Sequence, residues 1–335
     1  MARSGRAGRR RQAPVVWILA VVSLVALVAG GVTALVRSRP SGEPSGSADP
    51  HAGHLGGGSS AMPAHFATLA SGGLPNEDLR PSRGMFATEC RHSHSSNDDP
   101  IVYPGKQGAA HHHDFFGNTT TDFTSTIDSL TASKLTTCRM KTDTAAYWAP
   151  ALARDGRWIE PASSDAYYRV APGVDAKAVK AYPKGLMMIA GDGHAASPQP
   201  TAIVAWACDR SLRVSVDLPS CPEHSDLTMR VTFQDCWDNK SADSEDHRSH
   251  VAYSGPDGCP LTHPVPMPQL TFVVHYPYTG PTDGLSLSPG SLLTGHADFV
   301  NTWDQDSLEN EIDKCLRRAV ICDPPGGTGG SPPTF

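Results

Sequence analysis

Histidines and carboxylates gather in three short segments of this chain, at residues 111–114, 246–250 and 296–298. Imidazole and carboxylate groups together suit a borderline divalent metal ion. They suit proton transfer near neutral pH equally well. These segments are therefore the candidate source of the chemistry, and a divalent metal is the candidate cofactor.

Spacing places particular side chains of these segments next to each other. Residues i and i+2 of a strand share one face, and residues i and i+3 are neighbours on a helical turn. The resulting pairs are His111 with His113, His296 with Asp298, and His247 with His250. The hypothesis is that at least two segments meet in one cleft. The alternative is a polar network that only orders long loops.

The cleft hypothesis assigns each group a role. The predicted catalytic residues, which would move protons or orient an imidazole, are His113, His247, Asp246 and Asp298. The predicted metal ligands are His111, His113, His250 and His296. The predicted substrate contacts are Arg248 and two indole rings that would stack on sugars, Trp237 and Trp303.

Short strands are the elements that must position these residues. Apolar and polar residues alternate with a period of two, or apolar runs are bounded by turn residues, at Ala202–Cys208, Leu212–Leu218, Leu227–Phe233 and Leu270–Tyr276. The 29 prolines and 31 glycines indicate long loops between strands. The pattern predicts a mainly β fold, a single β-sandwich or jelly-roll-like domain with long loops.

One helix is expected close to the C-terminus. Asp306 would cap it and Glu309 would complete a capping box. A shorter helix is expected at 125–133. The apolar face of the C-terminal helix would contain Leu308, Ile312, Cys315 and Leu316.

The eight cysteines predict a disulfide-stapled domain. Their number is even and no Cys-x-x-Cys motif is present, so structural disulfides are favoured over a thiolate zinc site. Sequence alone leaves 105 pairings open. Proximity along the chain favours Cys90–Cys138, Cys208–Cys221, Cys236–Cys259 and Cys315–Cys322.

The N-terminal segment predicts where the domain works. Residues 14–36 carry no charge and are almost all apolar, long enough to cross a bilayer. The arginine-rich leader at 1–13 would stay in the cytoplasm. We expect a single-pass cell-membrane protein with its domain outside. The alternative is a signal peptide cleaved near Ala34 and a secreted domain.

Composition divides the rest of the chain. Residues 37–62 are rich in Gly, Ser and Pro and predict a disordered linker, as do residues 323–335 at the C-terminus. The extracytoplasmic domain would span 63–322. Seven of the 28 basic residues lie in 1–39, which has no acid, so the remainder holds 21 basic and 34 acidic residues. Such an acidic domain is a poor candidate for binding nucleic acid.

A series of longer motifs resembles the DUF1996 family, a domain of unknown function in exported actinobacterial and fungal proteins. The resemblance spans roughly residues 66–315. The motifs that carry it include DPIVYPG at 99–105, HHHDFFGN at 111–118, AAYWAPAL at 145–152, CWDN at 236–239, DHRSHVAY at 246–253 and GHADFVNTW at 295–303. Two positions depart from the family pattern, Asp114 in place of a small or hydroxyl residue and Asn239 in place of glycine.

The resemblance implies recurrent polar positions at His111, His113, Asp246, His247, His250, His296 and Asp298, and it brings no established activity. Three functions fit these observations. The first is a metal-dependent or polysaccharide-active enzyme of the cell envelope. The second is a non-catalytic module that binds glycan or wall polymer, and the third is a structural envelope protein.

Overall fold

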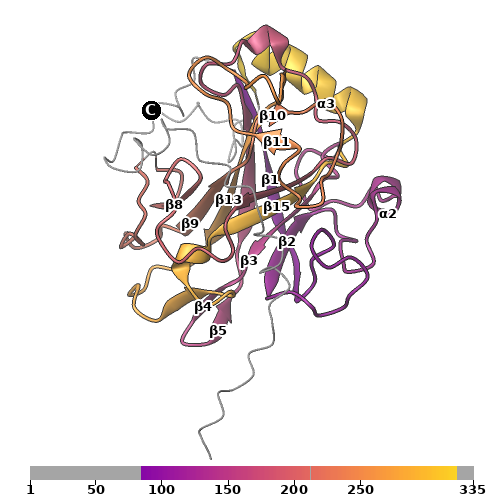
Figure 1. Ribbon diagram of the computed structural model, residues 1–335. Coiled ribbons are helices and arrows are strands. Elements are labelled where there is room, and N and C mark those ends of the chain that lie inside the picture. The colour runs from indigo at the N-terminus through magenta and orange to yellow at the C-terminus, as the bar shows by residue number, and fades with distance from the viewer. Residues whose placement is uncertain (1–83, 212, 323–335) are drawn as a thin grey trace, which may run out of the picture. The chain divides into compact units, whose positions relative to one another are not determined.

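The computed structural model describes residues 84–211 and 213–322 (Figure 1). The predicted leader, apolar span, linker and C-terminal tail, at 1–13, 14–36, 37–62 and 323–335, lie outside this part of the chain. Among the described residues, none of the helices has the length and apolarity needed to cross a membrane.

A ten-stranded sheet forms the frame of the described domain, in the order β7-β15-β3-β2-β1-β6-β13-β9-β8 with β16 added beside β1. All pairs are antiparallel except β1 with β16. The strands are β1 (Met85–Ser96), β2 (His113–Gly117), β3 (Ala146–Pro150), β6 (Ser163–Arg169), β7 (Met187–Gly191), β8 (Val204–Cys208), β9 (Leu227–Thr232), β13 (Gln269–Tyr276), β15 (His296–Val300) and β16 (Ile321–Cys322).

Two small three-stranded sheets lie outside this frame. One has the order β11-β10-β12 and the other β14-β4-β5. Their strands are β10 (Cys236–Trp237), β11 (Val251–Ala252), β12 (Val265–Pro266), β4 (Leu152–Arg154), β5 (Arg157–Ile159) and β14 (Leu285–Leu287).

The long strand β1 joins the two halves of the large sheet. Its first part, through Arg91, pairs with β6, and its last part, from His92 to Ser96, pairs with β2. The register shifts between His92 and His94, and such a bulge bends a strand and increases its twist. The halves therefore face each other. The sheet is nearly closed into a barrel, and Gln234 after β9 donates to the Ile189 carbonyl of β7 at 3.1 Å.

Aromatic side chains fill the space between the two halves. Tyr147 of β3 stacks on Phe272 of β13 with ring centroids 5.3 Å apart. Phe299 of β15 meets Phe233, just after β9, at 6.1 Å. All four side chains are fully buried, so the main core lies inside the curved sheet. The predicted mainly β fold is confirmed.

Three of the four predicted strands are confirmed as β8, β9 and β13. The fourth prediction, Leu212–Leu218, is wrong for the residues that the structure describes there. Only Ser215 pairs with the sheet, through a single bridge to Trp206. The segment lies in the loop that the Cys208–Cys221 disulfide closes.

The predicted helices are present. The short helix is α2 (Ile127–Ala132), capped by Thr126. The C-terminal helix is α3 (Gln305–Glu311), and it continues as the π-helical turn η6 (Ile312–Leu316). The predicted cap is wrong by two residues, because Asp304 rather than Asp306 is the N-cap and accepts the backbone hydrogen of Ser307, at 3.0 Å. The predicted apolar face, Leu308, Ile312, Cys315 and Leu316, is fully buried.

All four disulfides predicted from proximity are present, and the described residues contain no free cysteine. The Cys90–Cys138 disulfide ties β1 to the chain that precedes β3. The Cys315–Cys322 disulfide ties η6 to β16. The remaining two close loops around β8 and β10.

Candidate functional site

Two of the three predicted segments meet on the outer face of the half-sheet β7-β15-β3-β2. The ligand atoms of His111, His113 and His296 all lie within 4.8 Å of one another. The ligand atoms of Asp99, His113 and Asp298 form a second set and also lie within 4.8 Å of one another. Since His113 belongs to both sets, we treat the five residues as one centre, called the His/Asp centre below.

Strand pairing puts these side chains on one face. Phe115 of β2 and Asp298 of β15 both lie opposite Trp148 of β3. Because side chains two apart share a face, His113 joins Phe115 and His296 joins Asp298. The same face carries a second, smaller apolar cluster, distinct from the main core, which contains Ile101, Phe115, Leu130, Ala146, Trp148, Ile189 and Val300.

Hydrogen bonds fix the orientation of two imidazole rings. His113 Nδ1 lies 3.0 Å from the carbonyl oxygen of Asp98, and His296 Nδ1 lies 2.8 Å from that of Thr294. A carbonyl oxygen only accepts, so Nδ1 carries the hydrogen in both rings and Nε2 carries the lone pair. A backbone carbonyl behind the distal nitrogen is the usual support of a metal-binding histidine.

The loop between β1 and β2 supplies the second carboxylate. Asp99 Oδ1 accepts the backbone hydrogens of Ile101 and Val102, both at 2.9 Å. This local turn, common for aspartate, folds the loop so that Ile101 packs into the smaller apolar cluster. The loop thereby covers the sheet face and carries Asp99 to His113 and Asp298.

Burial makes the two carboxylates difficult to ionise together. Asp99 is 2% exposed and Asp298 is 1% exposed. Burial raises the pKa of Asp99 to about 6, although its two backbone hydrogen bonds and the charge of His247 oppose the shift. Burial, and then the charge of Asp99, raise the pKa of Asp298 well above its ordinary value. Both groups would be stabilised as anions by a nearby cation.

Asp298 has a further feature that points to a ligand. Its Oδ2 atom is buried and has no hydrogen-bond partner. Leaving a buried carboxylate oxygen without a partner costs about 1–3 kcal/mol or more. The backbone of Gly193 closes the other side of the site, where an added Cβ would lie 3.2 Å from the His296 ring. Only His111 among the five is partly exposed, so solvent reaches the centre from its side.

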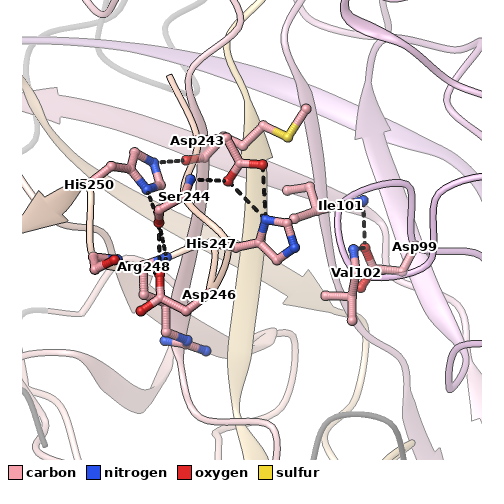
Figure 2. A network of polar contacts seen from close by, with 11 residues as sticks. Asp99, Ile101, Val102, Asp243, Ser244, Asp246, His247, Arg248 and His250 are labelled. Carbon is pink, nitrogen blue, oxygen red and sulfur yellow. Dashed lines mark hydrogen bonds and ion pairs between the residues drawn. The ribbon is translucent and has the colours of Figure 1, made fainter. Parts of the chain in front are cut away.

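The third predicted segment forms a turn beside the centre (Figure 2). Asp246 Oδ1 accepts hydrogen bonds from the Ser244 and Ser249 hydroxyls and from the backbone of Arg248 and Ser249. Although partial burial opposes the shift, these bonds hold the pKa of Asp246 well below its usual range. Such a carboxylate is a poor proton acceptor, so a role as general base is disfavoured, and the catalytic role of Asp246 stays a prediction.

His250 is likewise not a metal ligand. Its Nδ1 lies 2.8 Å from the Ser244 hydroxyl and its Nε2 lies 2.7 Å from the Met187 carbonyl. Both ring nitrogens are therefore used inside the protein, and the side chain is 1% exposed. His250 instead anchors the 241–250 loop to β7. Its predicted place in the metal site is corrected on this ground.

His247 lies between the turn and the centre. Its Nδ1 is 2.8 Å from Asp243 Oδ1 (Figure 2), and its charge lowers the pKa of Asp99. Arg248 donates to the Ile189 carbonyl at 3.3 Å and its charge lowers the pKa of Asp298. Both residues therefore border the His/Asp centre from the solvent side, where His247 stays a candidate proton carrier and Arg248 a candidate substrate contact.

The two predicted sugar-stacking indoles differ in position. Trp303 is 3% exposed, packs edge-on against Phe86 and donates its Nε1 hydrogen to the Tyr168 hydroxyl at 3.0 Å. Its ring faces the main core, so the prediction that it contacts substrate is wrong. Trp237 is half-buried and donates to the Ser241 carbonyl at 2.6 Å. It holds the start of the 241–250 loop, and its contact with sugar remains a prediction.

Sequence reasoning missed Asp99 as a member of the centre. Asp99 opens the DPIVYPG motif and follows Asp98 directly, but it lies outside the three segments from which the site was predicted. Two other groupings of potential ligands, one around Cys90 and Cys138 and one around Cys236 and Cys259, involve disulfide-bonded cysteines. Oxidised sulfur does not bind metal as a thiolate does, so neither competes with the His/Asp centre.

Comparison with known proteins places this site inside a family. A family model described as "Domain of unknown function (DUF1996)" matches residues 99–303. The match begins at Asp99 and includes all five residues of the centre. Neither a curated protein nor a solved structure matches the chain.

Proposed function

Since the chain belongs to the DUF1996 family, we propose that this protein is a metal-dependent, polysaccharide-active protein of the cell envelope. A divalent transition metal ion would be held by His111, His113 and His296 together with Asp298. Asp99 would complete the charge balance beside it.

The observation that carries the proposal is the convergence of three imidazoles. The ring centroids of His111 and His113 lie 4.1 Å apart, and those of His111 and His296 lie 5.0 Å apart. Ligands about 2.0–2.1 Å from a tetrahedral zinc are roughly 3.3 Å from one another. The ligand atoms lie within 4.8 Å of one another, so a closure of at most about 1.5 Å would bring the nitrogens to this spacing.

The charge of the centre supports a cation over an empty site. Two buried carboxylates within 4.8 Å repel each other in a medium of low dielectric. A dication would satisfy Asp298 Oδ2 and remove this repulsion. Imidazole nitrogens with carboxylate oxygens favour Zn²⁺, Fe²⁺, Ni²⁺ or Cu²⁺ over Ca²⁺ or Mg²⁺, which prefer oxygen alone.

The arrangement would also place the reactive side of a bound metal ion toward solvent. When bound, the metal supplies a Lewis acid that polarises an oxygen or lowers the pKa of a bound water. His111, which is partly exposed, marks the approach for a substrate. His247 would exchange protons between Asp99 and Asp243, because it borders one and lies 2.8 Å from the other.

Export and tethering form part of the same proposal. Four disulfides favour an oxidising compartment. Residues 14–36 would hold the domain at the outer face of the membrane, or would be removed to release it. Whether residues 14–36 stay attached or are removed does not change the chemistry of the His/Asp centre.

A polysaccharide screen tests the activity. The purified full-length chain is incubated with polysaccharides in the presence and absence of chelator, and soluble products are measured. We expect product release that is lost with chelator and with His113→Ala. His224→Asn serves as the matched control, because His224 is exposed and has a left-handed backbone that asparagine tolerates.

Binding without turnover would distinguish the alternatives. Retention of the wild-type chain on a polysaccharide without any product would favour a non-catalytic glycan-binding module. Neither retention nor product, with full metal occupancy, would favour a structural metal site in an envelope protein.

A further inference from the structure

A hollow of about 520 Å³ lies at the β4–β5 hairpin, outside the His/Asp centre. None of the residues that sequence analysis assigned to the site contributes to it. It is lined by Arg154, Asp155, Arg157, Trp158, Ile159 and Tyr278. Figure 1 shows β4 and β5 side by side at one end of the described domain.

Trp158 forms an exposed aromatic wall of this hollow. Its side chain is 51% exposed, and it is one of four large apolar residues in the described part of the chain with such exposure. His112 stacks against the indole with ring centroids 4.7 Å apart and ring planes 23° apart. His112 is in turn hydrogen bonded to Asn97 at 2.9 Å. The exposed ring is therefore held in a fixed orientation.

The charges around Trp158 leave a net positive group in the hollow. Arg154 pairs with Asp155 at 3.5 Å and lies over the Tyr278 ring, 5.7 Å from its centroid. Arg157 forms no ion pair with any residue that the structure describes, and its side chain is exposed. A guanidinium recognises a carboxylate through two parallel hydrogen bonds.

We propose that this hollow binds an acidic glycan, with Trp158 stacked on a sugar ring and Arg157 paired with a sugar carboxylate. A uronic acid ring offers a flat C–H face to the indole and a carboxylate to the guanidinium. This set of groups is what the hollow complements. Arg154 would contribute less, because Asp155 already offsets its charge.

The hollow and the His/Asp centre share one short piece of chain. His111 and His113 belong to the centre, whereas His112 between them stacks on Trp158. Neighbouring side chains on an extended backbone point in opposite directions. The segment 111–113 therefore carries candidate metal ligands on one side and, on the other, the imidazole that stacks on Trp158.

The inference rests on the proposed function for its class of substrate, polysaccharide, but its test does not depend on metal. Binding is measured by affinity electrophoresis and calorimetry with metal-free, full-length chain. The probes are polygalacturonate, alginate, and the methyl ester of polygalacturonate, which has the same sugar chain without the charge.

The expected results separate stacking from charge. Wild-type chain binds at least one acidic polymer more than tenfold more tightly than the methyl ester. Trp158→Ala weakens this binding at least tenfold, and Trp158→Phe restores part of it. Arg157→Gln removes the preference for the acid over the ester. Leu261→Ala, which removes the most exposed large apolar side chain of the described residues and does not line the hollow, changes nothing.

Two outcomes would overturn the inference. In the first, the wild-type chain binds neither acidic polymer more tightly than it binds the methyl ester. The other is Trp158→Ala binding as tightly as wild type. His296→Ala provides the distinction from the proposed function, because it should lose metal and retain glycan binding, whereas Trp158→Ala should retain metal. A failure of one site therefore leaves the other measurable.

Discussion

The imidazole rings of His113 and His296 lie 5.9 Å apart, on two strands that flank β3, and each donates its Nδ1 hydrogen to a backbone carbonyl. Strand pairing, rather than a flexible loop, sets their separation. A site on paired strands is held more firmly than one on loops. The two rings therefore form the rigid part of the His/Asp centre, and the loop that carries Asp99 completes it.

Asp298→Asn should separate the two effects of this carboxylate. Asparagine removes a buried ionisable group that lies beside Asp99, so we expect the chelator-treated variant to be at least as stable as the wild type. Metal at about 100 times its dissociation constant should stabilise the wild type by about 2.7 kcal/mol. This corresponds to about 5–10 °C in melting temperature for a domain of this size. Thermal unfolding with and without metal checks both expectations.

The variant should lose most of that metal-dependent shift. An equal shift in Asp298→Asn and wild type would show that this carboxylate is not a ligand. A large loss of stability in the chelator-treated variant would show that Asp298 is needed for folding itself.

Trp303→Phe should affect stability and leave glycan binding unchanged. The substitution removes the hydrogen bond from Nε1 to the Tyr168 hydroxyl and leaves a small cavity beside Phe86. A loss of about 1–3 kcal/mol in the free energy of unfolding is expected. Chemical denaturation measures the loss, and the polysaccharide probes used for Trp158 test binding. Weaker glycan binding without a change in stability would contradict the core position of Trp303.

Asp143→Asn should reduce the dependence of stability on pH. Burial raises the pKa of Asp143 to about 7, although hydrogen bonds from Tyr147 and Ala145 oppose the shift. The folded state therefore binds this proton more tightly than the unfolded state, whose value is near 3.8. Its stabilising contribution is complete below pH 3.8 and is lost as the pH rises through 7.

Denaturation at pH 5 and pH 8 measures this effect. Both proteins should lose unfolding free energy between pH 5 and pH 8. The loss in the wild type should exceed the loss in Asp143→Asn by a few kcal/mol. The raised pKa of Asp235, about 6, acts in the same direction in both proteins and cancels in the comparison. Asp257→Asn, at an exposed position, is the control. The same pH dependence in wild type and Asp143→Asn would show that Asp143 is ionised throughout.

Replacing Cys208 and Cys221 by alanine should destabilise the domain without removing metal. The disulfide closes a loop across a separation of 13 residues, worth about 3 kcal/mol by chain entropy. The loop carries Arg210, whose Nε lies 3.0 Å from the buried Asp165 carboxylate. Unfolding and metal content are measured together. Metal loss from the folded double variant would contradict the placement of the centre on the other half of the sheet.

Much of the fold follows from local pattern. The strands β9 and β13 show period-two alternation or apolar runs because one face of each packs on the main core and the other carries polar groups. The buried side of the C-terminal helix followed from helical spacing in the same way. The 213–218 segment had the same alternation, but it lies in the loop that the Cys208–Cys221 disulfide closes, and it pairs with β8 only at Ser215. The order in which strands pair depends on contacts between residues far apart in the sequence, so the local alternation does not predict it.

The His/Asp centre shows that spacing in the sequence does not predict which carboxylate joins the site. The segments HHDF at 112–115 and HADF at 296–299 look equivalent. However, Asp298 lies opposite Trp148 whereas Asp114 lies opposite Ala149. This difference of one residue in register turns the two carboxylates to opposite faces of the sheet. Asp114 accepts a hydrogen bond from Ser95 at 2.6 Å instead of joining the centre.

The loop residues were the hardest to predict. Helical spacing of His247 and His250 suggested a shared face, but the segment folds as a turn around Asp246, with His247 at φ +54°. Asp99 reaches the centre only because its loop folds back on the sheet. Asn239, which replaces a glycine expected from the family resemblance, has φ +62°. This left-handed conformation explains the preference for glycine there, and it is accessible to asparagine.

Metal content of the purified full-length chain tests the central claim most directly. After exposure to zinc and removal of excess ion, elemental analysis should find about one metal ion per chain in the wild type and in His224→Asn. The double variant His113→Gln with His296→Gln should contain almost none while it remains folded. A wild type without metal, or a double variant with the same metal content as wild type, would contradict the His/Asp centre as a metal site.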